Sequence, residues 1–161
     1  MNLTTICKVL RWASVALALL LLIGWCDTGE STTAACFADL NEAVCAHIDR
    51  TAMTQADADR LERFYGLNEE DYVNLTLYIP SDSMVYVEEL LLVELKEASQ
   101  KETVLAAIEE RLNTQKNTFE NYNLFGQYEK LTDHAHVEVC GSFILLTVNV
   151  DDAWQAFLNT V

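Results

Sequence analysis

The chain has 161 residues, of which 51% are hydrophobic and 22% charged, and its formal net charge is −15. This length suits one domain with a core of its own. Lys8 and Arg11 are the only charged side chains before Cys26, so the remainder holds 8 basic against 25 acidic residues and a net charge of −17. A polyanion repels phosphate backbones and anionic headgroups, so we expect no nucleic-acid partner. An acid excess is typical of a solubilising surface, and also of a docking site for a basic partner or a cation.

Residues 1–26 have the pattern of an export signal. Lys8 and Arg11 precede an uncharged, mostly apolar run at 12–25, and a positive start before a short apolar run is typical of a secretory signal. As a helix this run is about 21 Å long. A membrane core is ~30 Å thick, so the length favours a signal over a full membrane span. The positive start places the rest of the chain on the outer side of the membrane.

Cys26 follows the apolar run directly. Residues 22–26 resemble a bacterial lipoprotein box, in which Cys26 is the lipidated residue, although Trp25 stands where such boxes have a small residue. Three modes therefore stay open: a lipid anchor on Cys26, an uncleaved N-terminal anchor, and secretion after cleavage at 33–35. We predict a targeting segment at 1–26, a polar tether at 27–33 and a single domain at 34–161.

The first half of this domain predicts two helices and then two strands. Apolar residues of 37–48 recur every three or four positions, as in a helix. Thr54 and Asp57 form a pattern like a capping box and indicate the start of a second helix. The alternation at 72–79 predicts a strand with one buried face, and the apolar run at 87–96 predicts a second strand.

A long helix follows. Ser99 and Glu102 indicate its start, and the chain breaks near 122–126, after which a short helical piece is expected. The apolar positions that we assign to its buried stripe are Val104, Ile108, Leu112 and Phe119.

The tail predicts a hairpin and a last helix. Residues 134–139 alternate, and 143–150 are almost continuously apolar, which indicates a strand in the middle of its sheet. Asp151 can cap the final helix. Two hairpins separated by a helix predict an α+β fold, specifically a two-layer sandwich with a four-stranded, mostly antiparallel sheet in the order α-α-β-β-α-β-β-α.

His134, His136 and Glu138 are the candidate metal ligands. They occupy alternate positions of a predicted strand, with Cys140 next in the series, and alternate residues of a strand share a face. Imidazole, carboxylate and thiol groups bind zinc or copper. The simpler interpretation is that the intervening apolar residues face the core and that this polar face is in water. We therefore predict no resident metal and no cofactor, and keep these residues as the alternative.

The other chemistry-bearing residues form no recognisable constellation. On one helix, Cys36 and Cys45 would lie about 13 Å apart along the axis, too far for a disulfide. Either of them could pair with Cys140, or all three could be free. The sequence has no nucleophile elbow, no phosphate-binding glycine loop and no calcium-loop spacing. We expect no catalytic residue and no enzymatic activity.

Four segments, at 64–67, 87–96, 111–122 and 139–146, resemble the DUF4358 family of small bacterial proteins with lipoprotein-like N-termini. The most specific part is a string at helical spacing: Arg111, Gln115, Phe119 and Tyr122. The resemblance implies an exported single α+β domain. It implies no activity and assigns no functional residue.

Together these patterns predict an extracytoplasmic domain that is attached to the cell membrane, or alternatively secreted. Its expected activity is non-enzymatic binding of an envelope protein or peptide, with the membrane contacted through the N-terminal segment. The alternative is a small extracytoplasmic metal-binding protein or enzyme that uses His134, His136 and Glu138.

Overall fold

The computed structural model describes residues 36–121 and 124–161, so the predicted targeting segment, the tether and Cys26 lie outside the described residues. Residues Ala35–Val161 form one compact unit. Within the described ranges, no helix has the length and apolar character that crossing a membrane requires. The elements follow in the order α2 (Phe37–Cys45), β1 (Met53–Gln55), α3 (Ala58–Tyr65), η1 (Glu69–Asp71), β2 (Asn74–Pro80), β3 (Glu89–Glu94), η2 (Ala98–Gln100), α4 (Lys101–Asn121), η3 (Leu124–Gly126), α5 (Gln127–Asp133), β4 (Ala135–Cys140), β5 (Phe143–Val148) and α6 (Asp151–Thr160).

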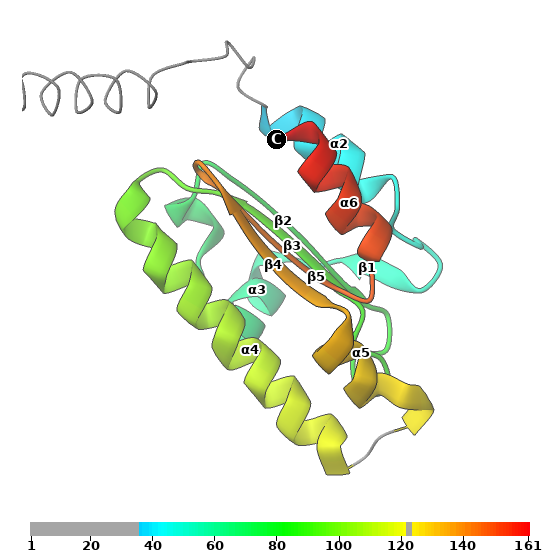
Figure 1. Ribbon diagram of the computed structural model, residues 1–161. Helices are drawn as coiled ribbons and strands as arrows, with labels where there is room; N and C mark the ends of the chain where they lie inside the picture. Colours follow the sequence, from blue (N-terminus) through cyan, green and yellow to red (C-terminus); the bar gives the residue numbers. More distant parts are fainter. Residues whose placement is uncertain (1–35, 122–123) are drawn as a thin grey trace, which may run out of the picture. The chain divides into compact units, whose positions relative to one another are not determined.

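The sheet is antiparallel and has five strands in the order β1-β2-β3-β5-β4 (Figure 1). The predicted hairpins are both present, but the predicted count of four strands is wrong. The additional strand, β1, pairs Met53 with Pro80 and is only three residues long, so it carries no alternation from which it could be predicted. Thr54 lies in this strand and does not begin a helix. The next helix, α3, begins after Asp57, whose side chain accepts a hydrogen bond from the Arg60 N–H at 3.0 Å.

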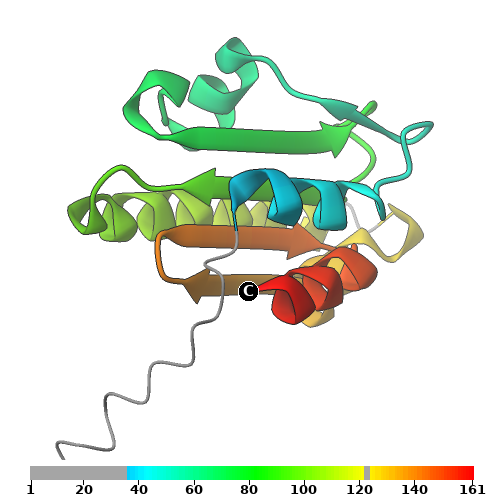
Figure 2. The ribbon, with the colours of Figure 1, turned by 90° about the horizontal axis from the view of Figure 1, so that it is seen from above.

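Helices cover both faces of the sheet, so the domain has three layers and not the predicted two (Figures 1 and 2). On one face α3, α4 and α5 enclose a core with Leu77, Ile79 and Leu91. On the other face α2 and α6 enclose a second core with Tyr78 and Leu145. The expected single buried face of the strand at 72–79 is therefore wrong, because its alternate residues enter different cores. The central strand predicted at 143–150 is confirmed as β5, which lies between β3 and β4.

Two predicted helix starts are displaced. The capping box before α4 uses Glu97 and Gln100, two residues earlier than the predicted pair of Ser99 and Glu102. Gln100 Oε1 accepts from the Glu97 N–H at 3.0 Å, which extends the ordered turn backwards. Asp151 lies in the first turn of α6 but makes no capping bond, because its carboxylate binds side chains of a neighbouring element.

Three connections between helices and strands lie at one end of the sheet. Because the strands are antiparallel, the end of β2, the start of β3 and the end of β5 lie together at this end (Figure 2). The segment from α2 to β1 reaches the same end, since β1 pairs with the last residues of β2. These three connections line an open pocket.

Candidate functional site

An open pocket of ≈ 550 Å³ lies at this end of the sheet. Asp49 comes from the α2–β1 connection, Asp82 and Tyr86 from the β2–β3 connection, Glu88 from the residue before β3, and Asn149 from the β5–α6 connection. Met53, Pro80 and Val150 add an apolar lining. No lysine or arginine is among the residues that line it. Three carboxylates therefore face a hollow of the size that holds a small ligand.

Glu88 is the most firmly held of these carboxylates. Its Oε1 accepts from Lys130 Nζ at 2.6 Å and from Asn149 Nδ2 at 3.2 Å. Partial burial raises the pKa of the Glu88 carboxyl, but the hydrogen bond and the charge of Lys130, with a further bond from Asn149, outweigh burial and hold the pKa below its ordinary value of 4.5. Glu88 is accordingly a carboxylate at neutral pH.

Asn149 has a backbone conformation that few residues adopt. Its φ is 54°, in the left-handed region that asparagine tolerates better than most side chains. The Asn149 N–H donates to the His134 carbonyl at 2.8 Å, which fixes this turn against the start of β4. This geometry directs the amide toward Glu88 and pre-organises that side of the pocket.

Asp49 and Asp82 stiffen the other two connections. Asp49 Oδ1 accepts from the Thr51 N–H at 2.9 Å and from the Thr51 hydroxyl at 2.6 Å, and these hydrogen bonds lower the pKa of the Asp49 carboxyl. Asp82 Oδ1 accepts from the Met84 N–H at 3.2 Å. Such local bonds from aspartate are typical of tight turns. Tyr86, 44% exposed, adds an aromatic ring to the lining of the pocket.

Of the candidate metal ligands, His136 and Glu138 lie at alternate positions of β4 and His134 directly precedes the strand, but each is already bound to another side chain. His134 Nδ1 lies 2.8 Å from Asp151 Oδ2, and His136 Nε2 lies 3.2 Å from Asp151 Oδ1. The His136 ring stacks on Trp154 with centroids 3.9 Å apart, and Trp154 Nε1 donates to Glu138 Oε1 at 3.0 Å. No group of three His, Cys, Asp or Glu side chains suited to a metal occurs within residues 36–121 and 124–161. The cluster ties α6 to β4.

The cysteine alternatives left open by the sequence are resolved for the described part of the chain. Cys36, Cys45 and Cys140 are all free thiols. Cys36 and Cys140 are exposed, whereas Cys45 is buried in the core under α2. Burial raises the pKa of the Cys45 thiol, so it acts as a small apolar side chain.

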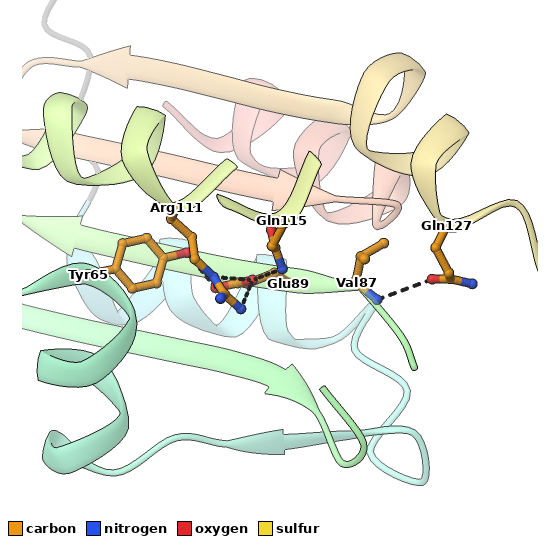
Figure 3. A network of polar contacts seen from close by, with 6 residues as sticks. All are labelled: Tyr65, Val87, Glu89, Arg111, Gln115 and Gln127. Carbon is orange, nitrogen blue, oxygen red and sulfur yellow. Dashed lines mark hydrogen bonds and ion pairs between the residues drawn. The ribbon is translucent and has the colours of Figure 1, made fainter. Parts of the chain in front are cut away.

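A buried ionic network was missed by sequence reasoning (Figure 3). Glu89 in β3 is 0% exposed and accepts from Tyr65 Oη at 2.6 Å, from Arg111 Nη2 at 3.0 Å and from Gln115 Nε2 at 3.0 Å. Burial, and then the charge of Glu89, raise the pKa of the Tyr65 hydroxyl well above 10, so Tyr65 is a proton donor here. The Arg111 guanidinium also lies 4.3 Å from the centre of the Phe64 ring.

The network joins segments that are distant in sequence. Tyr65 ends α3, Glu89 begins β3, and Arg111 and Gln115 lie one turn apart on α4. The spacing of Arg111 and Gln115 was the one available signal, because it places both side chains on one face of a helix. Both oxygens of the Glu89 carboxylate accept hydrogen bonds, so this arrangement holds three elements together.

The described residues thus form a three-layer α+β domain with an antiparallel sheet and an acidic pocket at one end. Residues 46–149 match the family model described as "Domain of unknown function (DUF4358)", which covers well over half of the chain, and the protein belongs to this family. The resemblance to this family is confirmed over residues 46–149. No curated protein and no solved structure matches the chain.

Proposed function

We propose that this protein is a non-enzymatic binding protein of the extracytoplasmic face of the cell membrane, and that its ligand carries a positive charge. The observation that carries the proposal is the pocket at the end of the sheet. Asp49 lines it from the α2–β1 connection, and Asp82 and Glu88 line it from the β2–β3 connection. No lysine or arginine lines it, and its one imidazole is that of His47. A small hollow in which carboxylates predominate concentrates cations.

The expected ligand group is an ammonium or a guanidinium on an aliphatic stem. The carboxylates accept hydrogen bonds from such a group. The exposed ring of Tyr86 offers a face for a cation, and Met53, Pro80 and Val150 offer contacts for methylene groups. A basic side chain of an envelope protein or peptide, or a polyamine, has this chemistry.

Binding is a better match than catalysis for these carboxylates. A general acid or base works best with a pKa near the working pH. The pKa values of Glu88 and Asp49 are shifted in the other direction, below their ordinary values. Both groups therefore remain charged at neutral pH, which suits a constant electrostatic contact.

The proposed location rests on the sequence of residues 1–26. Lys8 and Arg11 before a short apolar run favour export, and Cys26 favours a lipid anchor. Mass spectrometry of the mature N-terminus tests this part by itself. A diacylglyceryl mass on Cys26 supports the lipid anchor, whereas an unmodified Cys26 contradicts it.

Calorimetric titration of the full chain in detergent with spermidine and with arginine amide tests the ligand class. We expect both cations to bind, citrate not to bind, and Asp82→Asn to weaken binding by about tenfold, equivalent to ~1.4 kcal/mol. Glu42→Gln is the matched control, since it removes one carboxylate from the exposed side of α2 outside the pocket. Equal affinities for wild type and Asp82→Asn would contradict the proposal.

A further inference from the structure

The two edges of the sheet differ in length and protection. β1, at one edge, has only three residues, which is a common way to make an edge strand a poor template. β4, at the other edge, has six residues and pairs with β5 on one side. Among the described residues, no strand pairs with its outer side. A strand of this length with an open edge is suited to accept another strand.

The outer side of β4 also has an apolar face, which the sequence assigned to the core. Val137 and Val139 are 39% and 36% exposed, because β4 is the last strand of the sheet within residues 36–121 and 124–161. A groove of ≈ 320 Å³ runs between Val137 and the side of α4 that carries Leu105 and Leu112. An added strand would place apolar side chains against this groove.

We propose that β4 pairs antiparallel with β4 of a second copy of the chain, about a two-fold axis at Val137. The two five-stranded sheets then form one continuous sheet, and the two α4 helices lie side by side on the same face. This surface is separate from the acidic pocket, so the inference does not depend on the proposed ligand.

The residues of β4 complement themselves in this register. A two-fold axis at Val137 places His136 opposite Glu138 of the second copy, and Glu138 opposite His136 of the second copy. His136 Nε2 stays on Asp151 and Glu138 Oε1 stays on the Trp154 indole, so each new pair uses His136 Nδ1 and Glu138 Oε2. It places Ala135 opposite Val139 of the second copy on the other face. Cross-strand pairs of an imidazole with a carboxylate, and of two apolar side chains, are both favourable. No shift of register by one residue preserves both pairings, because alternate residues lie on opposite faces.

The α4 side of the groove is self-complementary in the same way. Glu109 and Lys116 both line the groove and lie two turns apart on α4. A two-fold axis reverses the direction of the second helix, which brings Glu109 toward Lys116 of the second copy. This reciprocal match of charges argues for a second copy as the occupant, since a symmetric interface requires each patch to match itself.

The negative charge of the domain opposes this pairing, so the strength of dimerisation should depend on the salt concentration. Two chains that each carry −17 after Cys26 repel each other over a distance set by the ionic strength, whereas the groove itself balances Glu109 with Lys116. Dimerisation should therefore strengthen as salt is added. An interface built mainly on ion pairs between copies would instead weaken as salt is added.

Cross-linking of the full chain in membranes tests the register. Val137→Cys is made in a chain that also carries Cys36→Ser and Cys140→Ser, and is oxidised with copper phenanthroline. The control is Val73→Cys in the same background, since Val73 is also an exposed valine but lies outside β4. We expect a disulfide-linked dimer on a non-reducing gel for Val137→Cys, and at least about tenfold less for Val73→Cys. Equal yields would overturn the proposal.

Sedimentation equilibrium of the full chain in a density-matched detergent provides the second readout. Wild type and Val73→Lys should have the mass of two chains, whereas Val137→Lys should raise the dissociation constant by about 100-fold. Circular dichroism shows whether Val137→Lys is folded. A wild type that stays monomeric at all protein and salt concentrations would overturn the proposal. If Val137→Lys does not fold, the cross-linking result alone decides whether β4 pairs with β4 of a second copy.

Discussion

Glu88 and Glu89 are neighbours in the sequence and have opposite surroundings in the domain. Glu88 lines the pocket and binds Lys130, while Glu89 is buried among Tyr65 and Arg111. Adjacent residues of an extended segment point to opposite sides, which separates the two carboxylates completely. One glutamate therefore contributes to the proposed ligand site and the other to the stability of the fold.

Neutralising Glu89 should destabilise the domain strongly. Glu89→Gln leaves Arg111 buried without its partner, and breaking one side of a buried ion pair costs about 3–5 kcal/mol. Chemical denaturation monitored by circular dichroism measures this loss. Glu94→Gln on the same strand is the control, because Glu94 is less buried and its carboxylate accepts a hydrogen bond from Asn74 Nδ2 at 2.6 Å. A loss below about 1 kcal/mol for Glu89→Gln would contradict the assigned role.

Single residues set a limit to what the sequence predicts here. The sequence predicts the second helix from a capping box of Thr54 and Asp57, but Thr54 lies in β1 and Asp57 is itself the N-cap, so the helix begins three residues later. Glu89 could not be predicted, since a charged residue in a strand indicates a wet face unless its distant partners are known. Tyr65 and Arg111 meet it only through the packing of α3 and α4 on the sheet.

At the scale of elements, the sequence correctly predicts those helices and strands that depend on residues close to one another in the chain. The hairpin of β4 and β5, the long helix α4 and the buried positions Val104, Ile108 and Phe119 all follow from periodicity and are confirmed. The short strand β1 forms only because β2 offers it a partner. The exposure of Val137 depends on which strand is at the edge, and strand order is not contained in alternation.

The contact between α5 and the start of β3 should make stability depend on acid pH. Lys130 of α5 lies 2.6 Å from Glu88, and the folded-state pKa of Glu88 is below its ordinary value of 4.5. A lowered pKa in the folded state stabilises the fold above the unfolded-state value, and this contribution is lost as the pH falls through the folded-state value.

Thermal melts of wild type and Lys130→Met between pH 7 and pH 3 measure this contribution. We expect Lys130→Met to lose about 1 kcal/mol at pH 7, because the pair is partly exposed. The difference between the two proteins should shrink as Glu88 is protonated. A difference that stays constant down to pH 3 would show that the Lys130–Glu88 contact does not stabilise α5.

At the scale of the whole molecule, charge is the dominant feature. The part after Cys26 carries −17, and self-repulsion of this size opposes the compact state. Raising the salt concentration from 0.01 M to 0.15 M shortens the screening length from about 30 Å to about 8 Å. The folded domain should therefore gain stability on the order of 1 kcal/mol over this range.

Urea denaturation in sodium chloride and in potassium chloride separates screening from specific binding. Equal gains in the two salts support screening, since it depends on ionic strength alone. Stability that is unchanged or lower at 0.15 M salt would contradict this account of the charge.

The claim that the acidic pocket binds a cation is tested most directly by mapping a titration onto the backbone amides. Nuclear magnetic resonance spectra of the full chain in detergent are recorded while arginine amide is added. The account predicts saturable shifts confined to 47–53, 80–88 and 149–150, the segments that line the pocket, and their loss in Asp82→Asn. Shifts spread over residues outside these three segments, or identical shifts in Asp82→Asn, would contradict it.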